Sequence, residues 1–168
     1  MDIGRRKQAN PSELGNVYQL LVNATAWLRE KGLSQWSRVY PVERFAKEVS
    51  AGQVWYWGIA DEPIATVTVY ENRPEYYPAG AWEDSATAWY LCRLAIARQF
   101  VGQRVGESVL ASLEGDAAAA AVQALRLDVA TSSSFLERYY VGQGFERHQV
   151  VEIFGERAAL LEKTIRRE

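Results

Sequence analysis

The chain has 168 residues, of which 48% are hydrophobic and 24% charged, and its formal net charge at pH 7 is −2. This length predicts one domain, residues 1–168, with a sizeable core. The small net charge, with both signs interspersed, predicts neither a nucleic-acid nor a membrane partner. Cys92 is the single cysteine, which excludes an internal disulfide and a cysteine-based metal cluster. No apolar run approaches 18 residues and no signal-peptide pattern is present, so we expect a cytoplasmic protein. We also expect no bound metal.

The N-terminal part predicts a short edge strand within residues 2–9 and then two helices. Asn10 fits an N-cap, Pro11 the first helical position and Glu13 a capping box, so a long helix should run from about 11 to 31. Its apolar face is Leu14, Val17, Tyr18, Leu21 and Leu28. A shorter helix begins at Pro41 and ends by Gly52, with a buried stripe of Val42, Phe45 and Val49.

The middle of the chain predicts a hairpin and a long loop. Residues 54–60 and 64–70 are strand candidates, and Asp61-Glu62-Pro63 forms the turn between them. Residues 71–87 contain two prolines, a glycine and several aromatic and acidic side chains. A loop of this length is expected to be functional or mobile.

The segment Trp89–Leu113 predicts a strand, a glycine-bearing loop and a helix in succession. The helix presents one apolar face, made by Val105, Val109, Leu110, Leu113 and Ala117. The first amides of a helix have no internal partner and its N-terminus is partly positive, so this end attracts phosphate. Gly102 and Gly106 allow close backbone approach. A P-loop is excluded because Glu107 follows Gly106, and the glycines lack the dinucleotide spacing.

The last part predicts a strand at 125–129, a helix and two further strands. Ser134 with Glu137 fits a capping box for this helix, and Gly144 fits its end. Residues 145–154 and 158–165 are the last two strands. The complete order is therefore β-α-α-β-β-β-α-β-α-β-β.

This order and two motifs resemble the GNAT superfamily of acyl-CoA-dependent N-acyltransferases, in its bacterial form. Leu94-Ala95-Ile96 matches the family's strand end, and residues 101–106 match its Q/R-x-x-G-x-G/A loop. Val101 replaces the usual Gln or Arg and Arg104 replaces the usual Gly. Residues 133–145 match the family's N-x-x-A-x-x-F-Y-E-K-x-G-F segment at Tyr140, Gly144 and Phe145, with Ser133 in place of Asn.

The resemblance implies an α/β (α+β) fold with a mixed, mostly antiparallel sheet of six to seven strands and about four helices. It implies an acetyl-CoA-dependent N-acetyltransferase. The expected cofactor-binding residues are Leu94, Ala95, Ile96, Val101, Gly102, Gln103, Arg104, Val105, Gly106, Glu107 and Ser133. Tyr140 is the expected general acid, because a phenol is protonated at neutral pH and can donate to the leaving thiolate.

Several points stay open at this stage. The acceptor is an amine of a small molecule or a peptide, and its general base could be Glu71, Asp84 or Glu152. The departures at Val101 and Arg104 leave a non-catalytic acyl-CoA-binding or regulatory module as the alternative. Apolar edge strands near the C-terminus make a homodimer plausible. His148 and Cys92 are expected to be structural.

Overall fold

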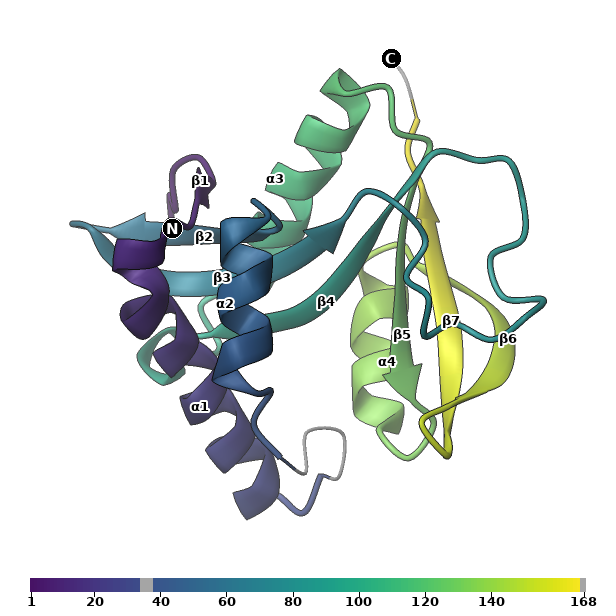
Figure 1. Cartoon of the computed structure of the whole chain (residues 1–168), viewed down its shortest axis with the longest axis horizontal. Coiled ribbons are helices and arrows are strands. Elements are labelled where there is room, and N and C mark those ends of the chain that lie inside the picture. Colours follow the sequence, from purple (N-terminus) through teal and green to yellow (C-terminus); the bar gives the residue numbers. More distant parts are fainter. Residues whose placement is uncertain (34–37, 167–168) are drawn as a thin grey trace. The chain divides into compact units, whose positions relative to one another are not determined.

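The computed structural model describes residues 1–33 and 38–166, and within these ranges the chain forms seven strands and four α-helices (Figure 1). The strands are β1 (Lys7–Gln8), β2 (Val54–Ile59), β3 (Glu62–Tyr70), β4 (Ala88–Ile96), β5 (Ala124–Ala130), β6 (Glu146–Ile153) and β7 (Glu156–Thr164). The helices are α1 (Leu14–Glu30), α2 (Val42–Ser50), α3 (Val105–Ala119) and α4 (Ser134–Gly142). This is the element order that the sequence predicts.

The strands hydrogen-bond in the order β1-β2-β3-β4-β5-β7-β6. β4 pairs with β5 in parallel, whereas β1 with β2, β2 with β3, β5 with β7 and β6 with β7 are antiparallel. The mixed, mostly antiparallel sheet is thereby confirmed. The residues group into two compact units, Met1–Val69 with Cys92–Ser112 and Tyr70–Leu91 with Leu113–Glu168. That the two units act as one domain stays a prediction.

In the first unit, α1 and α2 pack together with β2 around one apolar cluster. Its buried members include Val17, Leu21, Phe45, Val49 and Val54. The start of this helical region follows the predicted chemistry: the Asn10 side chain accepts from the Ser12 amide, and Glu13 accepts from the Asn10 amide. Pro11–Glu13 form a short 3-10 turn that leads into α1.

The predicted apolar stripe of α2 needs one correction. Val42 is 38% exposed, whereas Glu48 is buried with Phe45 and Val49. Glu48 takes a core position because an arginine of β4 forms an ion pair with it at 2.6 Å. The hydrophobic pattern of the helix cannot predict this pair, since its partner lies 45 positions along the chain.

In the second unit, β5 and β7 form the longest continuous ladder, from Ala124↔Thr164 to Ala130↔Ala158. The loop of residues 71–87 is closely packed in this unit, with Tyr77 and Trp82 both buried. The Arg73 guanidinium donates to the carbonyls of Tyr77, Pro78 and Ala81, which fixes the loop's own conformation.

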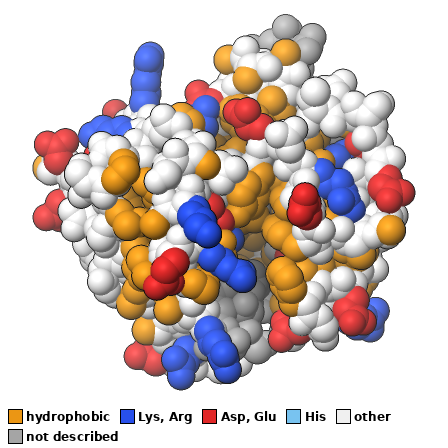
Figure 2. All heavy atoms as spheres, viewed as in Figure 1, with side chains coloured by type: hydrophobic (Ala, Val, Ile, Leu, Met, Phe, Trp, Pro, Cys, Tyr) orange, Lys and Arg blue, Asp and Glu red, His pale blue; other side chains and the backbone are white. Residues whose placement is uncertain are grey.

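α3 carries the predicted buried face in full. Val105, Val109, Leu110, Leu113 and Ala117 are each no more than 3% exposed. On the face of the molecule seen in Figure 2, acidic and basic side chains are interspersed rather than gathered into a patch of one sign. Among the described helices, none has the length and apolar character needed to cross a bilayer.

Candidate functional site

The segment between β4 and α3 is a loop with two left-handed residues that leads into the start of a helix. A 3-10 turn at Arg98–Phe100 follows β4, and the chain then turns through Gly102 at φ +84° and Arg104 at φ +61°. Left-handed backbone is routine for glycine and costs a larger residue about 1–2 kcal/mol. A Cβ at Gly102 would meet open space, so this glycine is required by its conformation rather than by crowding.

Several amides of this loop are available to a ligand. Among the described residues 101–108, the amides of Val101, Gln103 and Ser108 each donate to a backbone carbonyl. The amides of Gly102, Arg104, Val105, Gly106 and Glu107 therefore have no such acceptor. Donors that converge at a helix N-terminus suit a phosphate group.

The two departures from the family pattern have different structural consequences. Arg104 occupies a left-handed position, which is why glycine is common there. Its guanidinium is 80% exposed and pairs with Glu107 at 2.6 Å, so it is directed toward its own helix. Val101 is 48% exposed and contributes no charge to the loop.

β4 changes conformation just before the predicted pantetheine-binding residues. Its recorded pairing with β5 covers only Ala88, Trp89 and Tyr90, although the strand continues to Ile96. Arg93 has φ +53°, which interrupts regular strand geometry. Ala95 is buried, while Leu94 and Ile96 are partly exposed.

Tyr140 lies on α4 in the second unit and is partly buried. Its ring contacts Tyr139 and Phe145 at centroid distances of 5.2 and 5.5 Å. Burial raises the pKa of Tyr140 above its usual range, and the nearby Tyr139 and Asp128 act in the same direction. No hydrogen bond of its hydroxyl to another described residue is recorded, so the proton is available for donation.

The start of α4 differs from the prediction. The N-cap is Ser133 rather than Ser134, and no side-chain capping bond forms. Glu137 pairs with Arg147 at 3.3 Å instead of closing a capping box. The buried Ser133 hydroxyl has no hydrogen-bond partner within the described ranges, at the position where the family has Asn.

The three carboxylates considered as general bases are poorly suited to that role. Glu71 and Glu152 are exposed. Burial would raise the pKa of Asp84, but its hydrogen bonds from Arg126 and the Ala86 amide outweigh this effect and lower it. Asp84 is thus held as a carboxylate by Arg126.

Asp128 on β5 is a candidate that the sequence analysis missed. It accepts a hydrogen bond from the Tyr77 hydroxyl at 2.6 Å, and none of the described lysines, arginines or histidine pairs with it. Burial raises the pKa of Asp128, although the bond from Tyr77 opposes the shift. The available signal was the strand LRLDVAT, whose charged residues 126 and 128 share one face. That face is covered by the 71–87 loop rather than by water.

The remaining reactive side chains have structural surroundings. His148 lies 3.3 Å from Glu162 and packs against Trp82, and its side chain is 46% exposed. Cys92 is half-buried. Among the described residues, no group of three His, Cys, Asp or Glu side chains could hold a metal ion.

Comparisons with known proteins agree with this architecture. Residues 25–156 match the family model for the acetyltransferase (GNAT) domain. The chain is 30% identical over 136 residues to an uncharacterized N-acetyltransferase, YesJ, of Bacillus subtilis, and the match covers 78% of this chain and 75% of that protein.

Solved structures share the fold at lower identity. A GNAT-family acetyltransferase of Streptococcus agalactiae superposes with a TM-score of 0.83 at 19% identity, covering 98% of this chain and 96% of the other. The aminoglycoside acetyltransferase AAC(6')-Ib, solved with coenzyme A, superposes with a TM-score of 0.72 at 17% identity, covering 95% and 94%. From its family match and its relative in Bacillus, the chain belongs to the GNAT acetyltransferase family and is an acyltransferase.

Proposed function

We propose that this protein transfers an acetyl group from acetyl-CoA to an amine of a small molecule or a peptide. The observation that carries the proposal is the set of five amides around the start of α3, those of Gly102 and of residues 104–107, that have no recorded backbone acceptor. Amide donors at a helix N-terminus suit a negatively charged diphosphate. The structure of AAC(6')-Ib with coenzyme A is consistent with this choice of acyl donor.

In this proposal the loop binds the diphosphate mainly through its backbone. Glu107 would repel phosphate from the first turn of α3, and Arg104 offsets that charge through their ion pair. Val101 and Gln103 complete the loop, while Gly102 allows the backbone to approach the anion. Ser133 completes the proposed cofactor contacts, through its hydroxyl.

The end of β4 is proposed to hold the pantetheine arm. An extended amide-bearing arm pairs with a strand whose backbone groups are available. Leu94, Ala95 and Ile96 provide that backbone after the point where pairing with β5 stops. A strand amide facing the thioester carbonyl would stabilise the oxyanion that develops there.

Tyr140 is proposed to protonate the departing thiolate. Because its pKa is raised, the phenol stays protonated throughout the neutral range. The same shift makes Tyr140 a weak acid, because its pKa lies further above that of the thiol it must protonate, which is about 8.5. Its contribution should therefore be near the lower end of the usual range for acid catalysis, about 10²-fold.

Asp128 is proposed to take the proton from the attacking amine, which must be neutral to act as a nucleophile. A half-buried carboxylate with no recorded cation partner among the described residues favours a positively charged ligand, and an ammonium group is such a ligand. Its raised pKa brings it closer to the range in which a general base works well. Tyr77 orients the carboxylate through its hydroxyl.

Calorimetry with acetyl-CoA, followed by an amine screen that detects free thiol, tests the proposal. We expect binding in the absence of acceptor and thiol release with at least one primary amine. Absence of acetyl-CoA binding would contradict the proposed donor, and binding without turnover over a broad screen would favour the non-catalytic alternative.

Tyr140→Phe tests the proposed acid. The variant should bind acetyl-CoA like the wild type and turn over about 10²-fold more slowly, because only the donated proton is lost. Tyr139→Phe is the matched control, since it removes a hydroxyl from the adjacent residue. Equal turnover of wild type and Tyr140→Phe would remove Tyr140 from the mechanism.

A further inference from the structure

Arg93 combines two unusual features within the first unit. Of the described non-glycine residues with positive φ, it alone lies inside a strand; the others lie in turns or loops. Its guanidinium is also largely buried, since the side chain is 15% exposed. Strain of this kind persists only where the surroundings enforce it.

Glu48 and Tyr40 enforce the position of the Arg93 side chain. Arg93 Nη2 lies 2.6 Å from Glu48 Oε2, and its guanidinium carbon lies 3.8 Å from the centre of the Tyr40 ring. The Tyr40 hydroxyl donates to the other Glu48 oxygen at 2.7 Å. The guanidinium therefore forms an ion pair with Glu48 and packs against the ring of Tyr40.

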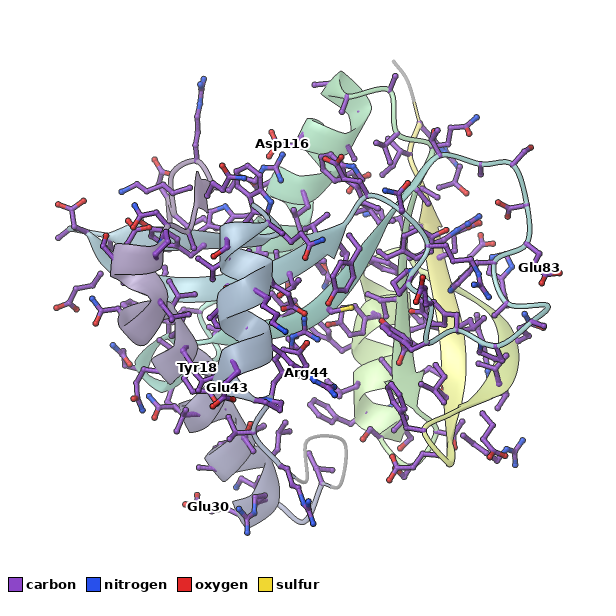
Figure 3. The ribbon with its side chains drawn as sticks, viewed as in Figure 1. Tyr18, Glu30, Glu43, Arg44, Glu83 and Asp116 are labelled. Atoms are coloured by element: carbon purple, nitrogen blue, oxygen red, sulfur yellow. The ribbon has the colours of Figure 1, made fainter. Side chains whose placement is uncertain are left out.

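The helices of the unit support this cluster. The Tyr18 hydroxyl of α1 donates to the Tyr40 carbonyl at 2.6 Å, and Glu48 belongs to the buried face of α2. Figure 3 labels Tyr18 on α1 and Arg44 on α2, the two helices from which the support comes. Burial and the bond to Glu48 raise the pKa of Tyr40 to about 12, so its hydroxyl remains a donor.

Stability alone does not account for such an arrangement. A buried ion pair is commonly no better for folding than two well-packed apolar residues. A left-handed arginine adds a further unfavourable contribution. The bend does have a consequence along the chain, because the next three residues are those proposed to bind the pantetheine arm.

We propose that Arg93 is a positioning residue, whose guanidinium is clamped by Glu48 and Tyr40 so that β4 stays bent and presents the backbone of residues 94–96 to the acyl donor. This inference rests on the proposed function. Under this inference, α1 and α2 contribute to donor binding indirectly, by supporting Arg93, and need not contact the donor themselves.

The double variant Glu48→Leu with Arg93→Leu separates positioning from stability. Two apolar side chains should keep the thermal midpoint at or above that of the wild type. Without the clamp, β4 is free to adopt regular strand geometry, so the Kd for acetyl-CoA should rise by at least about tenfold, as expected for a small misplacement of binding groups. Amide exchange of a peptide covering residues 92–97 should change in the unliganded protein.

Asp61→Ala is the matched control. Asp61 also has a positive φ, +66°, and an ion pair with Lys7, but its side chain is 98% exposed. Its removal should leave both the Kd and the exchange of residues 92–97 unchanged. Should the double variant fail to fold, Arg93→Lys and Glu48→Gln replace it, with Arg93→Lys expected to retain more affinity because it keeps the charge.

The outcomes are distinguishable. If folded clamp variants bind acetyl-CoA with wild-type affinity, the positioning role is overturned while the proposed donor stands. If the wild type itself binds no acetyl-CoA, the proposed function fails, and the role of Arg93 in donor binding fails with it. Weaker binding in the clamp variants together with an unchanged Asp61→Ala control supports the positioning role.

Discussion

Arg126 of the second unit is buried and Arg93 of the first is largely buried, and the two arginines are stabilised in different ways. Arg126 is 1% exposed, and its guanidinium donates to Glu162, Asp84 and the Tyr90 hydroxyl. Trp82 packs over it at 4.7 Å. Its φ is not in the left-handed region, whereas that of Arg93 is +53°. One arginine is therefore relaxed and multiply bonded, and the other is strained.

This difference separates a structural role from a positioning role. Arg126 joins the 71–87 loop to β5 and β7, where two carboxylates compensate its charge. Burial alone would lower the pKa of Arg126, but its hydrogen bonds outweigh that effect and raise it. Arg93 pairs with Glu48, and its positive φ interrupts the regular geometry of the strand that contains it. Hydrogen-bond satisfaction indicates stability, and enforced strain indicates function.

Arg126→Met should give the largest effect on folding. Removing the guanidinium leaves Glu162, which is 15% exposed, without its main partner, and such losses cost about 3–5 kcal/mol. For a chain of this size the thermal midpoint should fall by about 10 °C. A calorimetric scan measures it, with Arg73→Met as a control for loss of an arginine that bonds only carbonyls. A midpoint within 2 °C of wild type (about the scatter expected from small changes) would contradict the structural role.

The stabilities conferred by Asp128 and by Asp84 should respond oppositely to pH. The raised pKa of Asp128 means that folding favours its neutral form, so its stability contribution is complete below about pH 4 and is lost as pH rises through the folded pKa. Asp128→Asn should therefore raise the thermal midpoint at pH 7, and the difference should vanish in acid. The same variant should lose turnover if Asp128 is the base.

Asp84→Asn is the counterpart. The lowered pKa of Asp84 means that its contribution is present above about pH 4 and is lost as pH falls through the folded pKa. This variant should lower the midpoint at pH 7 and match wild type in acid. Unfolding scans at about pH 2, 5 and 7 distinguish the two, because the lowest pH lies well below the unperturbed pKa of an aspartate. Shifts of the same sign in both variants would show that Asp128 is paired like Asp84.

Regular features of the sequence predicted most of the fold. The period of the apolar residues placed the buried face of α3 in full, and Asn10 with Glu13 predicted the cap before α1. Gly144 ends α4 as expected, with φ +92°. Each of these depends on residues close together in the chain, for which local rules suffice.

Features that depend on distant residues were missed. Glu48 is buried because of Arg93, and Asp128 is half-buried and bonded to Tyr77, which lies in a loop 51 positions away. The capping box at Ser134 does not form because the N-cap is Ser133, which places Glu137 at the fourth helical position, and Glu137 pairs with Arg147 instead. The left-handed conformation of Arg93 could not be predicted from its residue type, since arginine is not enriched at positive φ. In the candidate site, the glycine loop and Tyr140 come from family motifs and their roles stay predictions, whereas no motif pointed to Asp128.

Arg104→Gly should have the smallest effect on stability and on donor binding. It tests whether backbone strain in an exposed loop has the same role as strain at Arg93. Arg104 is also left-handed, at φ +61°, but its ion pair with Glu107 is exposed to solvent. Glycine relieves the strain while making the unfolded chain more flexible, so the two changes should nearly cancel, to within about 1 kcal/mol. Because the amides of the loop persist, the Kd for acetyl-CoA should change by less than about threefold, the effect of one solvent-screened charge. A tenfold weakening in calorimetry would instead place the Arg104 guanidinium on the diphosphate, and would show that strain in an exposed loop also positions a binding group.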